Sequence, residues 1–122
     1  MKVELLDGRT VQIDSDRITY EREIDVILPL SDRFLVLFDV FEFSESDPDA
    51  GRNLFAYDST GKQLWRVQDA KMKRRGRTVE KLSQGYTGLR QGKDGTIYAW
   101  VMDWRYELDP NTGKISNPKY FR

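Results

Sequence analysis

Short runs of alternating apolar and polar residues cover most of the chain, and residues that favour turns separate them. The clearest case is 53–67, NLFAYDSTGKQLWRV, in which strand-like runs at 54–57 and 62–67 flank the segment Asp58-Ser59-Thr60-Gly61. An aspartate accepts backbone hydrogen bonds in such a turn, and a glycine adopts the positive φ that closes it. The sequence therefore predicts a β-hairpin here, around which the rest of the fold is organised.

The same signals recur on both sides of this hairpin. Asp7-Gly8 lies between alternating runs at 3–6 and 10–13, which is a strong hairpin signal. Residues 96–102 alternate at strand period, and Asp103 is expected to turn the chain after them. The polar residues 14–23 predict a connection. Shorter strands are expected at 25–28, 86–90, 104–108 and 114–115, with Pro118 arguing against a regular strand farther on.

The most apolar stretch is 34–43, FLVLFDVFEF. As a strand it would place Phe34, Val36, Phe38 and Val40 on one face and Leu35, Leu37, Phe41 and Phe43 on the other. Apolar residues on both faces indicate a central strand that is covered on both sides. Asp39 interrupts one face, so its carboxylate is expected to be solvated or paired.

Together these patterns predict a single mainly β domain over 1–122, with little helix. About eight or nine antiparallel strands in meander order would form a sandwich, an open barrel or two blade-like sheets that share one core. Residues 68–84 lack clear β-alternation and contain KMKRRGR, which predicts a mobile basic loop. The core is expected from 34–38, 54–57, 64–67 and 97–101.

Charge divides the chain into two unlike halves, although the formal net charge is zero. Residues 1–50 contain 13 Asp or Glu against 5 Lys or Arg, and the second half has the opposite excess. The acidic run consists of Asp39, Glu42, Glu45, Asp47 and Asp49, and the basic run of Lys71, Lys73, Arg74, Arg75 and Arg77. Such asymmetry steers a charged partner, or the two runs pair within the fold.

Several kinds of chemistry are excluded or disfavoured by composition. The chain contains no histidine and no cysteine, which rules out Ser-His-Asp and Cys-His nucleophilic sites, histidine-ligated zinc and disulfides. No apolar run is long enough to span a membrane, and the first residues show no secretory signal, so we expect a cytoplasmic protein. No site constellation or phosphate-binding loop is visible, so we expect neither an enzyme nor a cofactor.

The segment DPDAGRN at 47–53 superficially resembles a calcium-binding loop. Its glycine is misplaced, and no bidentate glutamate follows at the required distance. We therefore expect a turn-rich loop and no metal site.

Aromatic residues cluster near the C-terminus at Trp100, Trp104 and Tyr106, with Asp103 between the tryptophans. Aromatic faces beside a carboxylate can stack on sugar rings or bases. Because these residues recur at strand period, the pattern favours core and cross-strand packing over a binding face.

One pattern occurs twice in the chain. Residues 55–62 and 106–114 both read aromatic-x-apolar-Asp and then end in Thr-Gly-Lys, with one extra loop residue in the second copy. The pattern resembles hairpins of β-propeller blades, particularly those of quinoprotein-like repeats. A complete propeller needs at least about four blades of four strands, for which this chain is too short.

The order of the pieces also resembles a class of small uncharacterised bacterial all-β proteins. The residues that carry this resemblance lie at 25–27, 33–39, 52–58, 61–67 and 106–114. Some members of that class look like immunity proteins, which block a secreted toxin by direct binding. The resemblance implies a fold, but no catalytic motif and no residue-level binding site.

These observations favour a non-catalytic protein-binding module of the immunity-protein kind. Its acidic residues Glu42, Glu45, Asp47 and Asp49 would suit a basic partner such as a nuclease toxin. The alternative is a ligand or nucleic-acid binder that uses the basic loop together with the aromatic face. A third possibility is a homo-oligomer in which acidic and basic surfaces pair between subunits.

Overall fold

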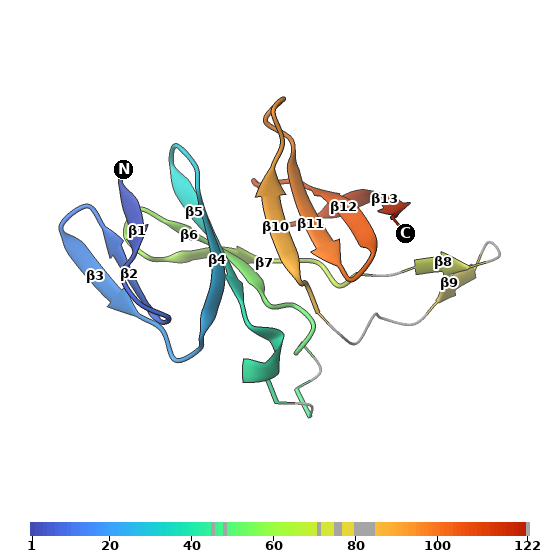
Figure 1. Cartoon of the computed structure of the whole chain (residues 1–122), viewed down its shortest axis with the longest axis horizontal. Helices are drawn as coiled ribbons and strands as arrows, with labels where there is room; N and C mark the ends of the chain where they lie inside the picture. Colours follow the sequence, from blue (N-terminus) through green and yellow to red (C-terminus); the bar gives the residue numbers. More distant parts are fainter. Residues whose placement is uncertain (45, 48, 71, 75–76, 80–84, 122) are drawn as a thin grey trace.

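The structure, a computed structural model, describes residues 1–44, 46–47, 49–70, 72–74, 77–79 and 85–121, with 72–74 and 77–79 described by their backbone alone. The described residues form antiparallel strands and one short 3₁₀ helix (Figure 1). The mainly β, antiparallel fold with little helix that the sequence predicts is therefore confirmed.

Neighbouring strands pair in chain order, so each sheet is a meander. The N-terminal sheet consists of β1 (Val3–Leu5), β2 (Thr10–Ile13) and β3 (Asp16–Thr19). The middle sheet consists of β4 (Ile24–Pro29), β5 (Arg33–Phe38), β6 (Leu54–Asp58) and β7 (Gln63–Arg66). The C-terminal sheet consists of β10 (Gly88–Gln91), β11 (Ile97–Val101), β12 (Trp104–Leu108) and β13 (Ile115–Tyr120).

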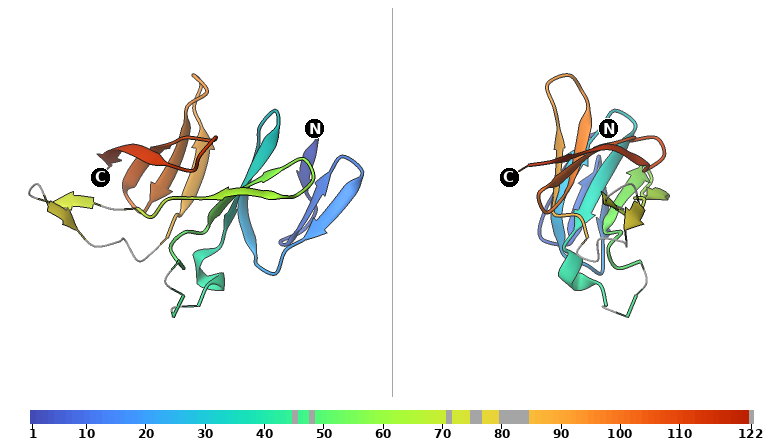
Figure 2. Two further views of the ribbon diagram at one scale, coloured as in Figure 1. Left: turned by 180° about the vertical axis from the view of Figure 1, so that it is seen from behind. Right: turned by 90° about the vertical axis from the view of Figure 1, so that its right-hand side faces the viewer.

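The three sheets are stacked in layers, with the middle sheet between the other two (Figure 2). One apolar cluster, which includes Val11, Ile13, Phe34 and Val36, fills the space between the N-terminal and middle sheets. The other cluster lies between the middle and C-terminal sheets and contains Leu35, Leu37, Leu54, Ala56, Trp65, Val67, Ala70, Tyr86, Leu89, Ile97, Ala99, Val101, Tyr106 and Leu108. Strand β5 contributes to both clusters, which confirms the prediction of a central strand covered on both sides.

Two facing four-stranded meanders share the second cluster, and among the described strands no sheet closes into a barrel. The hairpins that repeat one sequence pattern, β6–β7 and β12–β13, occupy the same third and fourth positions in their sheets. Both turns begin with an aspartate whose carboxylate accepts a hydrogen bond from the backbone two residues on. Both have a glycine at positive φ, Gly61 at 84° and Gly113 at 77°. The repeated pattern thus produces a repeated structure.

The described residues contain thirteen strands, more than the eight or nine expected. The connection expected at 14–23 contains β3, an edge strand that pairs with β2 and is largely exposed, so its composition is polar. The stretch 68–84 contains the paired strands β8 (Met72–Arg74) and β9 (Arg77–Val79). The mobility predicted for that stretch remains a prediction.

Contrary to expectation, β13 continues through Pro118. Asn117 and Pro118 together oppose Tyr106 of β12, and Asn117 has a φ of 50°. A bulge on an edge strand is a position where proline is tolerated, because no ladder hydrogen bond is required of its nitrogen.

A fully buried asparagine, Asn53, links the middle sheet to the chain that enters the C-terminal sheet. Its amide nitrogen donates to the carbonyl oxygens of Phe38, at 2.7 Å, and Tyr86, at 2.8 Å. Its amide oxygen accepts from the backbone nitrogen of Tyr86 at 2.7 Å. The bond to Phe38 lies within the middle sheet, and the two bonds to Tyr86 tie the start of the C-terminal sheet to it, so this side chain joins the two sheets.

A second joint lies at the β12–β13 turn. The carbonyl oxygen of Pro110 accepts from the Trp65 indole at 2.9 Å and from the Arg33 guanidinium at 3.1 Å. The Trp65 ring lies so close to Gly113 that a Cβ there would be only 2.5 Å from a ring carbon. Both donors come from the middle sheet, so this turn is held against it.

Candidate functional site

The turn that follows β5 carries the most exposed large apolar side chain of the described residues. Strand β5 ends at Phe38, and the 3₁₀ helix η1 (Val40–Glu42) follows. The Asp39 carboxylate accepts a hydrogen bond from the backbone nitrogen of Phe41 at 2.9 Å, which caps the helix. Phe41 is 90% exposed. The strand predicted over 34–43 is therefore wrong beyond Phe38, because the capping aspartate ends it.

Past the helix the chain returns to the core. Phe43 is buried in the cluster that contains Phe34, the opposite side from the one its position in a continuous strand would give. The Arg22 guanidinium lies 4.2 Å from the centre of the Phe43 ring. Phe41 thus projects from a short turn anchored on both sides, by Phe38 before it and Phe43 after it.

Four carboxylates lie on or near the turn that carries Phe41. The Glu42 carboxylate accepts from the backbone nitrogen of Glu23 at 3.1 Å, and Arg9 pairs with both glutamates, at 3.0 Å and 3.5 Å. Asp39 lies beside Asp25, the extra residue at the register shift in β4. We call Glu23, Asp25, Asp39, Phe41 and Glu42 the Phe41 surface.

This surface has more negative charge than the protein neutralises there. Asp25 is exposed and has no ion pair within the described part of the chain. Partial burial raises the pKa of Asp25, and the negative charge of Asp39 raises it further. A positive charge placed at this point would relieve the repulsion between the two carboxylates.

The other acidic residues predicted to bind a partner do not belong to the Phe41 surface as the structure describes it. Asp47 accepts from the backbone nitrogen of Asp49 at 2.8 Å, and Asp49 pairs with Arg52 at 3.1 Å. Both are half-buried and help to hold the loop. Glu45 lies outside the described residues. Of the predicted acidic set, Glu42 belongs to the Phe41 surface.

The basic run lies on or beside the β8–β9 hairpin, which extends beyond the C-terminal sheet in Figure 1. Lys73 and Arg74 belong to β8 and Arg77 to β9. Lys71 and Arg75 lie outside the described residues. On the Phe41 surface, Glu23 and Glu42 pair with Arg9, which also belongs to the first half of the chain.

The three aromatic residues predicted to share a face do not share one. Tyr106 is buried in the core between the middle and C-terminal sheets, and Trp104 packs against that core. Trp100 lies on the opposite face of the sheet, because β11 and β12 join through a two-residue turn that pairs Val101 with Trp104 and Trp100 with Arg105. The core interpretation therefore holds for Trp104 and Tyr106, and Trp100 belongs to a different surface.

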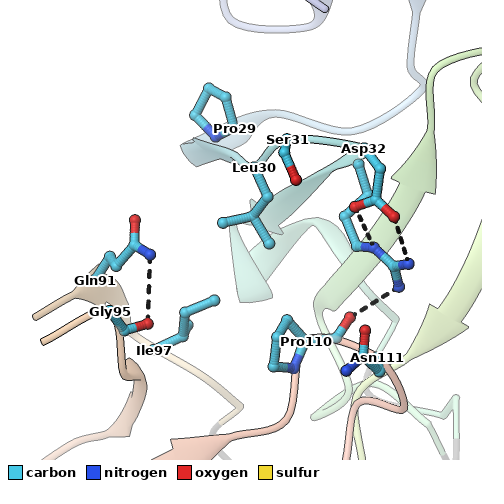
Figure 3. A pocket seen from close by; sticks show the side chains of 10 residues that line it. Pro29, Leu30, Ser31, Asp32, Gln91, Gly95, Ile97, Pro110 and Asn111 are labelled. Carbon is cyan, nitrogen blue, oxygen red and sulfur yellow. Dashed lines mark hydrogen bonds and ion pairs between the residues drawn. The ribbon is translucent and has the colours of Figure 1, made fainter.

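A shallow cleft of about 500 Å³ lies where three hairpin turns meet (Figure 3). Its charged side chains, Asp32 and Arg33, are bonded to each other. Arg33 makes two 3.0 Å hydrogen bonds to the Asp32 carboxylate and one to Pro110, and Gln91 donates to the carbonyl oxygen of Gly95. The Arg33 guanidinium holds the pKa of Asp32 below its usual range. Through Arg33 and Pro110 the cleft lies at a joint between the middle and C-terminal sheets.

Sequence reasoning placed Phe41 inside the protein, and a local signal for its exposure was available. Asp39 is a good helix N-cap, and an N-cap after a five-residue apolar run marks the end of a strand.

The side chains that surround Arg105 were likewise overlooked as a group. Counting back across a two-residue turn would have paired Trp100 with Arg105.

Two structural observations bear on what kind of protein this is. Among the residues that the structure describes, no helix is both long and apolar enough to cross a bilayer. Among the same residues, no three potential metal-ligating side chains lie together.

The family described as "Domain of unknown function (DUF7957)" matches residues 1–120. No curated protein and no solved structure shows significant similarity to the chain.

Proposed function

The chain belongs to the DUF7957 family, and we propose that it is a non-catalytic protein-binding module that holds a basic partner protein through the Phe41 surface. One observation carries the proposal. Phe41 is 90% exposed on a capped turn, and four carboxylates lie on or near that turn. A single exposed apolar residue is ordinary on a protein surface, so the argument rests on the combination of ring, anchored turn and charge.

An aromatic side chain fixed at the centre of a polar rim is the arrangement that dominates many protein interfaces. Covering a phenylalanine fully is worth about 1.5–3 kcal/mol in transfer free energy. Because η1 is already capped by Asp39 and held by Phe43, little ordering of this turn would be needed on binding. Phe41 is thus suited to fill an apolar pocket on a partner.

The carboxylates indicate the charge of that partner. Asp25 and Asp39 repel each other, and a lysine or arginine from a partner would relieve the repulsion. A surface of one sign also accelerates association with a partner of the opposite sign. The sequence resemblance to immunity proteins supports a basic toxin as that partner, and we propose that the partner is a protein of this class.

A non-catalytic role suits this surface better than an enzymatic one. The chain has neither histidine nor cysteine, and the carboxylates of the Phe41 surface line no cleft found among the described residues that could exclude water. Charge attraction and apolar contact are what the arrangement supplies.

Affinity capture from the cells that naturally produce the protein tests the proposal. The tagged wild type, Phe41→Ser and Leu64→Ser would be compared after nuclease treatment at moderate salt. Leu64 is a matched control, because it is 42% exposed and lies on β7, apart from η1. We expect one stoichiometric basic protein with the wild type and Leu64→Ser, and its loss with Phe41→Ser.

Capture of the same protein by all three forms would exclude the Phe41 surface as the binding site. An empty column for the wild type would contradict the protein-binding role. A partner with an acidic surface would contradict the charge assignment while leaving Phe41 as the anchor.

A further inference from the structure

The C-terminal sheet has a second face, directed away from the core that it shares with the middle sheet. In β11, Ile97, Ala99 and Val101 are buried, while Tyr98 and Trp100 point to this second face and remain half-exposed. The strand register places Arg105 opposite Trp100, and Lys119 opposite Arg105. We call Tyr98, Trp100, Arg105, Lys119 and Phe121 the Arg105 face.

Aromatic rings hold the Arg105 guanidinium from several sides. Its central carbon lies 4.2 Å from the centre of the Tyr98 ring and 4.7 Å from that of Phe121. The Trp100 ring centre is 5.9 Å away, and Trp100 and Phe121 contact each other at 5.1 Å. Lys119 lies 5.0 Å above the Phe121 ring. Cation–π contacts of this kind position the charge without using its hydrogen-bond donors.

Those donors have no partner in the rest of the described chain. The Arg105 side chain takes part in no ion pair or hydrogen bond among the described residues, and it is half-exposed. The nearest carboxylate in the register is that of Glu107, which accepts a hydrogen bond from Asn117. A planar guanidinium that is fixed, accessible and unpaired is ready to bind an anion through two donors at once.

The charge around Arg105 favours an anion further. Lys119 is its cross-strand neighbour and is exposed, and the exposed Arg90 lies opposite Tyr98. Three cations therefore accompany three aromatic rings on this face, where the nearby carboxylates include Glu107 and, beside the Tyr98 ring, Asp94. An anionic ligand with planar groups matches both features.

We propose that the Arg105 face binds single-stranded nucleic acid. In such a strand negative phosphates alternate with flat bases, as cations alternate with rings on this face, and every base offers a surface for stacking. An acidic peptide would satisfy Arg105 and Lys119 but would leave the rings without matching groups. This surface lies in the second half of the chain, apart from η1, so the inference goes beyond the proposed function and can fail independently of it.

The test uses fluorescence anisotropy with the full chain. The probes are a fluorescein-labelled thymidine oligonucleotide, the corresponding uridine oligonucleotide, and a labelled polyglutamate peptide of similar charge. Binding would be measured at several salt concentrations, with protein up to about 100 µM, the weak end of non-specific affinities. We expect both oligonucleotides to bind and to quench tryptophan fluorescence, and the peptide to bind more weakly.

Three variants locate the contact. Arg105→Gln should weaken oligonucleotide binding about tenfold or more and reduce the slope of log affinity against log salt by about one. Trp100→Ala should weaken it by about fivefold or more, the lower end for a stacked base. Lys119→Gln keeps the test valid if Trp100→Ala fails to fold, because Lys119 is exposed and its loss should also lower the salt slope.

Arg17→Gln is the matched charge control. Arg17 is exposed on β3 and, within the described residues, makes no ion pair. Arg17→Gln should change the affinity for the oligonucleotides far less than Arg105→Gln does. Equal losses in the two variants would overturn the site, and tighter binding of polyglutamate would assign the face to an acidic protein. No oligonucleotide binding at the highest protein concentration would also overturn the inference.

Discussion

Replacing Asn53 by alanine tests how the two larger sheets are joined. The Asn53 side chain is fully buried and makes three hydrogen bonds of 2.7–2.8 Å to the backbone of Phe38 and Tyr86. Asn53→Ala removes all three and leaves three backbone groups in a site with little room for rearrangement. Gly85, beside them, is itself so close that a Cβ there would lie 3.0 Å from the Asn53 amide oxygen.

The expected cost follows from those bonds. A buried backbone group left without a partner costs about 1–3 kcal/mol. If local relaxation satisfies one of the three, the loss is about 2–6 kcal/mol, and we take about 4 kcal/mol as the expected value. A domain of this length is stable by about 6–18 kcal/mol, so the variant should fold but with far less stability.

Urea denaturation followed by circular dichroism measures this loss. With a slope of about 2 kcal/mol per molar urea, the midpoint should fall by about 2 M. The control is Asn111→Ala, an exposed asparagine in the β12–β13 turn, which should change stability by less than about 0.5 kcal/mol. Equal midpoints for the two variants would refute the argument that Asn53 joins the sheets.

The matched variant Asn53→Asp keeps the size of the side chain and separates hydrogen bonding from volume. At neutral pH its carboxylate can still accept from the Tyr86 nitrogen, but it faces the carbonyl oxygens of Phe38 and Tyr86 that asparagine donates to. The loss should therefore be at least as large as with alanine. The two carbonyl oxygens destabilise the charged carboxylate. The loss of folding stability should therefore shrink as the pH falls toward about 4 and the carboxyl gains a proton.

Three further predictions concern single features of the fold. Asp39→Asn keeps a capping side chain but removes a charge, so the pKa of Asp25, followed by NMR, should fall toward its usual value; an unchanged pKa would contradict the proximity of the two carboxylates. Gly113→Ala should destabilise more than Gly95→Ala in urea denaturation. Both glycines have positive φ, which costs any other residue roughly 1–2 kcal/mol. Only the substitution at Gly113 would also bring a methyl group against the Trp65 indole ring. Equal losses of stability in the two variants would argue against that contact. Burial raises the pKa of Tyr57 to about 12, so the folded protein keeps a proton that the unfolded chain loses above about pH 10. The free energy of unfolding should therefore fall as the pH rises from about 10 to 12. A free energy that stays constant over this range would contradict the raised pKa of Tyr57.

Local signals predicted the hairpins well because their causes are local. Asp7-Gly8 and Asp58 to Gly61 both close turns between paired strands, with the aspartates accepting backbone hydrogen bonds as expected. The two-sided burial of β5 was also predictable, since apolar residues at consecutive positions leave no face for water. What these signals could not give is the way the sheets stack, because that depends on distant contacts such as those of Asn53.

The candidate site was harder to predict because it departs from the regular pattern. Periodicity treats Phe41 as the next inward residue of a strand, whereas the cap at Asp39 ends the strand first. Acidic residues nominated by their clustering in sequence differ in role, since Asp49 pairs with Arg52 while Glu42 lies beside Phe41. The edge strand β3 escaped, and only the start of β13 was expected, because exposed strands need little apolar content.

The affinity of the purified wild type and of Phe41→Ser for the captured partner tests the central claim most directly. Isothermal titration calorimetry at one salt concentration would compare both with Leu64→Ser. An aromatic anchor contributes at least about 2 kcal/mol, so Phe41→Ser should bind about 30-fold more weakly or worse, while Leu64→Ser binds as the wild type does. Equal affinity of Phe41→Ser and the wild type would contradict the account and place the binding surface elsewhere on the protein.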